Sequence, residues 1–252
     1  MNSWDHRERA WGAASISRAG SRTSFLKRVY SLFTASIVFS AIGALVALNA
    51  GLSSSAAVLR VGAKTVVVPP LVAFFGQHYI IGMLVMLGVV FGASMVRHVK
   101  GLNVLALFGM ATVIGVVIAP TLFYATLASS IGNTLSASPV RDAFILSTVG
   151  FAGLTGYALT TRKDFSFLGG GLTMGLFVII GASLLNLFFA SSVFSLAISS
   201  VAVLLFGAFV LYDTSRLLHS DEEDAVGGAI SLYLNFLNIF LALLRILSSR
   251  RD

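Results

Sequence analysis

The stretch that decides the fold is residues 209–246, FVLYDTSRLLHSDEEDAVGGAISLYLNFLNIFLALLRI. An acidic turn joins the end of one apolar run to the start of the next, and the full runs, residues 193–218 and 226–247, are each long enough to cross a bilayer. Asp213 lies in the first run and is the only carboxylate in the interior of any long apolar run of the chain. A carboxylate at such a position is costly in lipid, so we expect it to face the inside of a helix bundle or a wet cavity.

The second run carries a stripe of polar residues. Ser231, Asn235, Asn238 and Arg245 follow at spacings that return to one side of a 3.6-residue helix. This pattern predicts a polar face, with Asn235 placed opposite Asp213. The face can be a working site or a set of hydrogen bonds that hold helices together, and the second interpretation suits Asn238 best.

Composition places the chain in a membrane. Hydrophobic residues make up 57% of the 252 residues, charged residues 11%, and the mean hydropathy is +0.92. Runs of roughly 20 apolar residues recur, and the lipid bilayer is therefore the first expected partner. The excess of lysine and arginine is spread over tails and turns, which favours a role in orientation and gives no indication of nucleic-acid binding. The absence of cysteine excludes disulfides and thiolate metal sites.

Seven apolar segments predict an all-α polytopic membrane protein, a bundle of seven helices. The expected spans are residues 29–48, 71–96, 103–127, 140–160, 168–189, 193–218 and 226–247. Residues 1–24 are polar, basic and rich in small residues, which predicts a disordered tail. Residues 25–252 are expected to form one membrane domain. Pro69 and Pro70 predict a loop or a distorted entry to the second span, and Pro120 predicts a kink in the third.

The distribution of basic residues predicts a cytoplasmic N-terminus. With that orientation, eleven lysines and arginines lie on the cytoplasmic side and six on the other, as the positive-inside rule favours. The basic C-terminus opposes this orientation unless the seventh helix re-enters without crossing, so its side stays open. Asp213 and Asn235 then lie at similar depths near the cytoplasmic end of the bundle.

Three motifs, in order, resemble the Bax inhibitor-1 family. They are Gly156-Tyr-Ala-Leu-Thr-Thr-Arg-Lys-Asp-Phe-Ser-Phe-Leu-Gly-Gly170, Leu211-Tyr-Asp-Thr214, and the run from Ser231 to Leu247. With the terminal Ser-Arg-Arg-Asp, they are most similar to the bacterial YccA-type branch, over about residues 25–252. The resemblance implies a multi-pass protein of a bacterial inner membrane, with seven helices and the last one near the centre of the bundle.

The resemblance also implies a pH-sensitive calcium leak. In the family, two aspartates on the sixth and seventh helices share protons, and an arginine at the end of the second helix latches the closed state onto the sixth-helix aspartate. Matched by motif, this aspartate is Asp213, a weak and transient calcium ligand, and the latch is Arg97. The second aspartate falls on Asn235, where the chain departs from the pattern. Close carboxylates titrate as a coupled pair, so a single carboxylate predicts a weaker pH response and a poorer calcium site.

Plainer interpretations stand beside these. Asp213 can be a structural acid paired with an arginine, and Arg97 can be a positive-inside anchor. Residues 221–224, DEED, lack the alternating ligands and the glycine of an EF-hand loop, so we expect a solvated acidic turn.

Two classes of function remain. The chain has no His-Glu-x-x-His, Gly-x-Ser-x-Gly or Walker motif, so we expect neither an enzyme nor a cofactor. YccA-type proteins resemble substrates and modulators of the membrane protease FtsH, and a long N-terminal tail suits a handle for such a protease. The glycine pairs of the spans suit packing within one bundle, so a monomer is expected. A cation leak is the first hypothesis and modulation of FtsH is the alternative.

Overall fold

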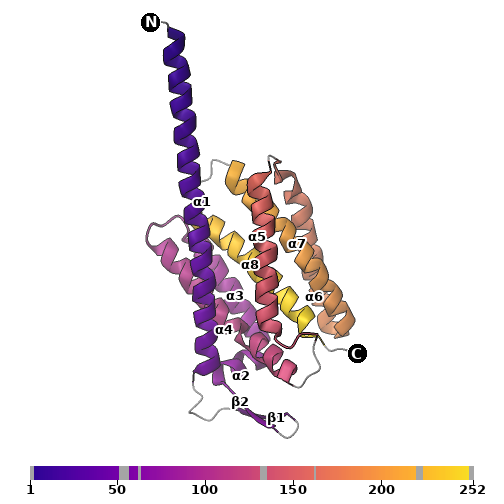
Figure 1. Cartoon of the computed structure of the whole chain (residues 1–252). Coiled ribbons are helices and arrows are strands. Elements are labelled where there is room, and N and C mark those ends of the chain that lie inside the picture. Colours follow the sequence, from indigo (N-terminus) through magenta and orange to yellow (C-terminus); the bar gives the residue numbers. More distant parts are fainter. Residues whose placement is uncertain are drawn as a thin grey trace.

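A computed structural model describes residues 3–50, 57–61, 64–130, 135–161, 163–219 and 224–249, without the side chains of 3–19 and 57–64. In chain order its elements are α1 (Ser3–Asn49), β1 (Ala57–Val61), β2 (Lys64–Val68), α2 (Pro70–Gln77), α3 (Tyr79–Met95), α4 (Leu102–Ser130), α5 (Pro139–Thr160), a short 3-10 turn η1 (Ser166–Leu168), α6 (Gly169–Phe189), α7 (Ser192–His219) and α8 (Ala225–Leu247). Figure 1 shows the long helices side by side in one bundle.

The predicted class of the fold is confirmed. Six described helices are long and apolar enough to cross a membrane, and the bent pair α2–α3 raises the number of crossings to seven. Most helix boundaries fall close to the predicted spans because long apolar runs between turn residues define them. The termini lie at opposite ends of the bundle (Figure 1). We call these the N-terminal end, with the α3–α4, α5–α6 and α7–α8 connections, and the C-terminal end, with the α4–α5 and α6–α7 connections.

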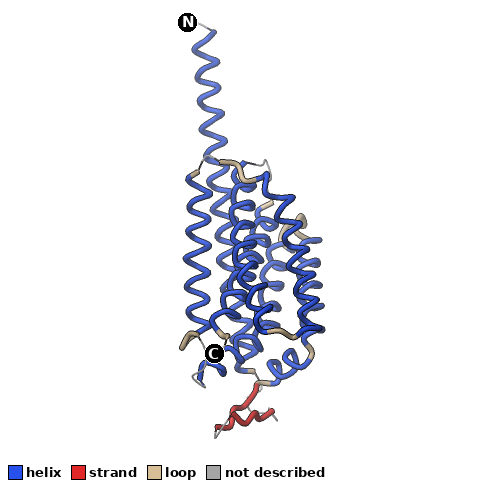
Figure 2. Tube along the Cα trace, turned by 90° about the vertical axis from the view of Figure 1, so that its right-hand side faces the viewer, coloured by secondary structure: helices blue, strands red, loops and turns tan. Residues whose placement is uncertain are grey.

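The second span differs from the single helix that the sequence predicts. α2 and α3 meet at an angle of 96°, because His78 between them has a non-helical backbone (φ −113°, ψ 54°). The His78 side chain hydrogen-bonds the Phe74 carbonyl oxygen through Nδ1 at 3.0 Å. Before α2, β1 and β2 form an antiparallel hairpin, which pairs Ala57 with Val68, where the sequence predicted a loop or a distorted entry to the helix. The hairpin lies beyond the C-terminal end of the bundle (Figure 2).

The N-terminal tail is helical where the sequence predicted disorder. Residues 3–24 continue α1 without a break, and the helix projects past the other helices (Figure 2). Alanine, arginine and glutamate in this segment favour helix, and a helix that already exists extends without a new nucleation step. Pro120 lies inside α4, which continues through it as one helix.

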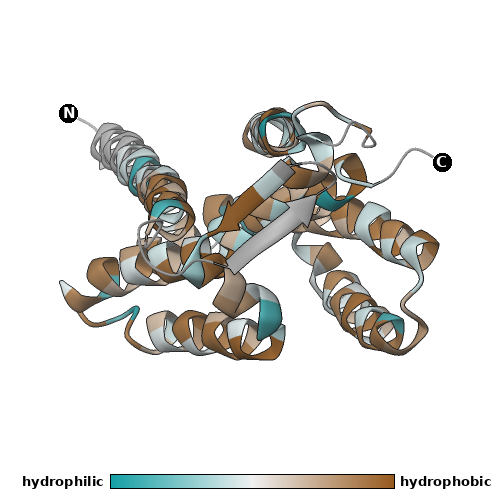
Figure 3. Cartoon of the chain, turned by 90° about the horizontal axis from the view of Figure 1, so that it is seen from below, coloured by the Kyte–Doolittle hydropathy of each residue, from teal (hydrophilic) through white to brown (hydrophobic). Residues whose placement is uncertain are grey.

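α8 is the central helix, as predicted. It packs against α1, α4, α5 and α7, and most of its residues are buried, including Leu232, Tyr233 and Leu244. The outer helices carry hydrophobic residues on their outward faces as well (Figure 3). Phe188, Val193 and Leu204, for example, are widely exposed. A helix that is apolar all round suits a lipid environment, so the chain has the build of a multi-pass membrane protein.

Two glycines allow α1 and α4 to cross in close contact. A side chain at Gly43 would overlap the carbonyl oxygen of Thr112, and one at Gly115 would overlap that of Ser40. Both obstacles are backbone atoms, which cannot rotate away. The hydroxyl of Tyr233 on α8 donates to Ser40 Oγ at 3.1 Å, so the central helix is joined to the same crossing.

Candidate functional site

The two residues singled out in the sequence meet inside the bundle. Asn235 Nδ2 on α8 donates a hydrogen bond to Asp213 Oδ2 on α7 at 2.7 Å. Both residues are buried, with exposed fractions of 7% for Asp213 and 6% for Asn235. The periodicity of each helix brings these side chains to the α7–α8 interface, in the half of the bundle nearer the N-terminal end. The interaction is a short, charge-assisted hydrogen bond when Asp213 is ionised.

A cation and two hydroxyls accompany the pair. Arg216, one turn along α7, places its Nη2 atom 4.0 Å from Asp213 Oδ1. Thr214, the neighbour of Asp213, shares a hydrogen bond of 3.2 Å with the hydroxyl of Tyr30 on α1. Asp213 therefore has an amide and a cation beside it, and its neighbour Thr214 contacts the phenol of Tyr30 on α1. Such a site can accept and release a single proton at the acid, because asparagine offers no second titrating group.

Aromatic rings fill the bundle at the level of this pair. Phe33 on α1 stacks on Phe151 on α5 with ring centroids 4.7 Å apart. Phe236, which directly follows Asn235, meets Phe33 edge-on at 5.9 Å and Phe151 at 5.8 Å. All three rings are buried. They form an apolar layer that reaches α8 at the residue after Asn235.

Arg97 forms an ion pair with Asp224, and not with Asp213 as the family resemblance implies. Its Nε is 3.3 Å from Oδ2 of Asp224, the residue directly before α8. The Arg97 side chain is 41% exposed and the Asp224 side chain 9%. The same Nε donates to His98 Nε2 at 3.0 Å. The implied pair with Asp213 is thus replaced by a pair that joins the end of α3 to the start of α8. The physical reason is position, because Arg97 follows the end of α3 and reaches the first turn of α8.

Asp224 has a role that the sequence analysis missed. It caps α8, because its Oδ1 accepts from the backbone nitrogen of Gly227 at 2.9 Å. A side chain at Gly227 would overlap the Asp224 carboxylate. The expected solvated turn is therefore wrong for Asp224, while residues 220–223 lie outside the described residues. An acid three positions before Gly227, directly ahead of an apolar run, is a helix-start signal that could have revealed the cap.

A double-mutant cycle separates the two roles of Asp224. Asparagine at position 224 keeps a capping oxygen but loses the charge, whereas alanine loses both. We expect Asp224→Asn to destabilise the protein less than Asp224→Ala, by about 1 kcal/mol, the usual value of a cap. Arg97→Gln is expected to cost up to about 1 kcal/mol alone and almost nothing in the Asp224→Asn background. Thermal unfolding in detergent measures all four values, and equal effects of Arg97→Gln in both backgrounds would contradict the ion pair.

The polar stripe of α8 does not form one site. Asn238 Nδ2 donates within its own helix, to the carbonyl oxygen of Leu234 at 2.7 Å, and not between helices as expected. Ser231 is half-buried. Arg245 lies ten residues beyond Asn235, which is about 15 Å along a helix. It therefore belongs to the C-terminal end of the bundle, away from Asp213.

The connection between α5 and α6 is tied to α7 at the N-terminal end. Ser215 Oγ donates to Asp164 Oδ1 at 3.1 Å and accepts from the backbone nitrogen of Phe165 at 2.9 Å. Hydrogen bonds from Ser166, and to a smaller extent from Ser215, hold the pKa of Asp164 below its usual value. The end of α7 that carries Asp213 and Arg216 is thereby held against its neighbours.

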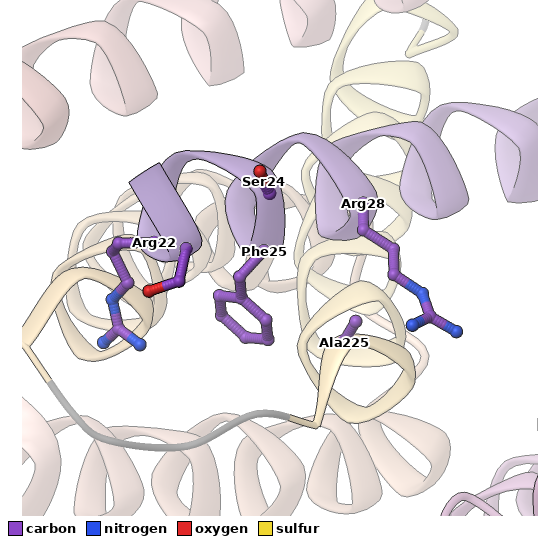
Figure 4. A pocket seen from close by; sticks show the side chains of 6 residues that line it. Arg22, Ser24, Phe25, Arg28 and Ala225 are labelled. Carbon is purple, nitrogen blue, oxygen red and sulfur yellow. The ribbon is translucent and has the colours of Figure 1, made fainter. Parts of the chain in front are cut away.

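α1 covers the other side of this end. Arg22 Nε donates to the carbonyl oxygen of Leu218 at 3.1 Å, and its guanidinium lies 5.4 Å from the centre of the Phe25 ring. Figure 4 shows these two side chains with Ser24, Arg28 and Ala225 around a small hollow where α1 passes the start of α8. In the described residues, no group of three histidines, cysteines or carboxylates could hold a metal ion.

Known proteins are similar to the chain over most of its length. A family model described as "Inhibitor of apoptosis-promoting Bax1" matches residues 22–252. An uncharacterized protein of Campylobacter jejuni is 37% identical over 235 residues, which cover 92% of this chain and 91% of that protein. "Protein lifeguard 4" of Mus musculus is 32% identical over 232 residues, covering 90% and 86%. An "Uncharacterized membrane protein" of Vibrio cholerae is 34% identical over 238 residues, 93% of each chain.

Proposed function

Because the chain belongs to the Bax inhibitor-1 family, we propose that it is a cation leak pathway, with calcium as the permeant ion, controlled by a proton on Asp213. The observation that carries the proposal is the buried hydrogen bond between Asp213 and Asn235. Acids inside membrane helices mark ion paths and proton-linked switches more often than they serve structure alone. Because Asn235 is an amide, Asp213 is the titrating group of this pair.

Protonation of Asp213 changes what holds α7 to α8. The ionised carboxylate accepts from Asn235 and attracts Arg216, 4.0 Å away on its own helix. A proton removes the charge, so both interactions lose the electrostatic part of their strength. The α7–α8 contact then loosens beside the aromatic layer of Phe33, Phe151 and Phe236. An apolar constriction blocks ions until it widens and is wetted, which links the proton to conduction.

The pair of Arg97 and Asp224 serves as the latch in this proposal. It joins α3 to the central helix at the same end of the bundle as Asp213. The family resemblance assigns the latch to an arginine and the acid of the proton site. Here the two functions lie on different acids, so the latch can be broken by mutation without removing the proton site.

The orientation of the proposal follows the charge distribution. The N-terminal end of the bundle, with Arg97, Lys100 and Lys163, faces the cytoplasm of a bacterial cell, in line with the positive-inside rule. α8 is long and apolar enough to cross the membrane. In this proposal α8 crosses the membrane fully, which puts its C-terminal end on the opposite side.

Asp213→Asn tests the proposal. Asparagine keeps the size and a hydrogen-bonding oxygen but takes no proton, so we expect calcium flux into proteoliposomes to lose its dependence on pH between acid and neutral conditions. Asp142→Asn, which changes a carboxylate at the C-terminal end of the bundle, is the matched control and should leave the dependence intact. Flux that keeps its pH dependence in folded Asp213→Asn protein would overturn the role of this acid.

Modulation of the membrane protease FtsH remains the second candidate. The observation in its favour is the N-terminal part of α1, which projects beyond the bundle (Figure 2) and offers a segment that a protease can grip. Deleting residues 2–19 stops short of Arg22, which contacts α7. We expect this deletion to slow degradation by the protease and to leave ion flux unchanged, whereas Asp213→Asn should do the reverse.

A further inference from the structure

The C-terminal end of the bundle holds a second feature, far from Asp213. A cavity of about 720 Å³ lies there, between the end of α4, the start of α7 and the end of α8. Its lining residues are Thr121, Tyr124, Ala125, Ala128, Ser192, Val193, Ser195, Leu196, Leu244, Arg245, Ser248 and Ser249. In the described part of the chain, α4 and α7 each pack on α8 but not extensively on each other, so α8 forms the floor and the other two helices form the walls.

Arg245 is the one charged group among these lining residues. The contact of its guanidinium is to the hydroxyl of Ser195, at 3.5 Å. Among the described residues, no carboxylate forms an ion pair with it, in contrast to Arg97, Arg141 and Arg216. The end of α8 offsets part of the positive charge through the helix dipole. Most N–H donors of the guanidinium therefore have no carboxylate partner in the described residues.

The other lining groups suit an amphiphile with an anionic head. Thr121, Tyr124 and Ser192 bring hydroxyl groups that can donate hydrogen bonds, and no acidic residue lines the cavity. Val193 and Leu196 provide apolar surface beside these groups. Guanidinium groups bind phosphate oxygens through two parallel hydrogen bonds, and hydroxyl donors add to such a site.

The depth of the cavity matches the headgroup layer of a bilayer. Ser192 begins α7 directly after the turn at Ala190, and Ser248 and Ser249 follow the end of α8. Tyrosine and arginine are favoured at this level because each joins an apolar body to a polar tip. Since Tyr124 and Val193 are exposed, the cavity opens towards the lipid.

We propose that this cavity binds the phosphate headgroup of an anionic phospholipid, with Arg245 as the anchoring residue and the hydroxyl-bearing residues of α4 and α7 around it. The acyl chains leave between α4 and α7, along apolar surface. The bound lipid bridges two helices that pack poorly on each other, so it stabilises this end of the bundle. The site is independent of the proposed ion leak, because it lies at the opposite end from Asp213.

Native mass spectrometry of the full-length protein tests the proposal. The protein is offered equal amounts of phosphatidylglycerol and phosphatidylcholine with the same acyl chains. We expect wild-type protein to retain phosphatidylglycerol in preference, and Arg245→Gln to retain it about tenfold less, because a charge-assisted hydrogen bond contributes roughly that factor. Arg245→Lys should keep part of the binding. Ala128→Phe, which fills the cavity without changing its charge, should also lower retention.

The controls decide between a lipid and other sources of phosphate. Arg141→Gln changes an exposed arginine of α5 at the same end of the bundle and should leave retention unchanged. Glycerol 3-phosphate carries the phosphate without acyl chains and should not displace the lipid. The proposal is overturned by equal retention of the two lipids, by unchanged retention in both Arg245→Gln and Ala128→Phe, or by full displacement with glycerol 3-phosphate, which would indicate a site for soluble anions.

Discussion

Asn235→Asp is expected to raise calcium flux at least about tenfold, because roughly 1.4 kcal/mol of added cation stabilisation corresponds to that factor. Asparagine at this position donates to Asp213 at 2.7 Å. An aspartate there brings two carboxylates to hydrogen-bonding distance. In this arrangement the site gains a formal negative charge when both acids ionise, and calcium prefers several oxygen ligands that include carboxylates.

The same change is expected to steepen the pH response. Two ionised carboxylates about 4 Å apart repel by roughly 4 kcal/mol at an effective dielectric constant of 20, so the pair holds one shared proton and titrates as a unit. Arg216 stays near Asp213 and offsets part of the repulsion. The wild-type site takes one proton at Asp213 alone, and its response to pH is therefore shallower.

Flux measurements in proteoliposomes at a series of pH values check both effects. Asn238→Asp is the matched control. Asn238 lies one turn further along α8, and its side chain donates a hydrogen bond to Leu234 of its own helix. It adds the same charge without forming the carboxylate pair. Equal flux and equal pH dependence in wild-type and Asn235→Asp protein would remove the physical basis of the proposed leak site.

The largest effect on stability is expected at the crossing of α1 and α4. Gly115→Ala places a methyl group on the carbonyl oxygen of Ser40, and only a shift of one whole helix relieves the overlap. Overpacking of this kind costs about 3 kcal/mol. For a domain of this size that corresponds to a fall in Tm of roughly 6–12 °C. Thermal unfolding in detergent, followed by circular dichroism, measures the change.

Gly109→Ala is the control for this prediction. Gly109 lies on the same helix, and an added methyl group there meets nothing within 4 Å. Alanine is the better helix former, so the Tm should stay the same or rise slightly. Similar Tm values for Gly115→Ala and Gly109→Ala would show that α1 and α4 do not cross as closely as described.

The sequence could predict the α7–α8 site because it depends on local patterns. Asp213 and Asn235 stand at defined positions of two consecutive helices, and an acidic turn fixes those helices as antiparallel neighbours. A buried acid needs a polar partner, and Asn235 was the nearest one at matching depth. The partner of Arg97 could not be found in this way. Arg97 follows α3, and no acid stands near it in the sequence, so local patterns do not identify its partner.

The sequence by itself determined the membrane class and the number of crossings, because these follow from the length and spacing of apolar runs, and its resemblance to the family implied the central place of α8. Tertiary structure alone decided the bend at His78, the ion pair of Arg97 with Asp224, and the cavity around Arg245. The bend is a backbone conformation at one residue, whereas the ion pair and the cavity depend on how far helices approach one another. A small shift between helices changes which ion-pair partner a side chain can reach and whether two helices close a gap or leave it open.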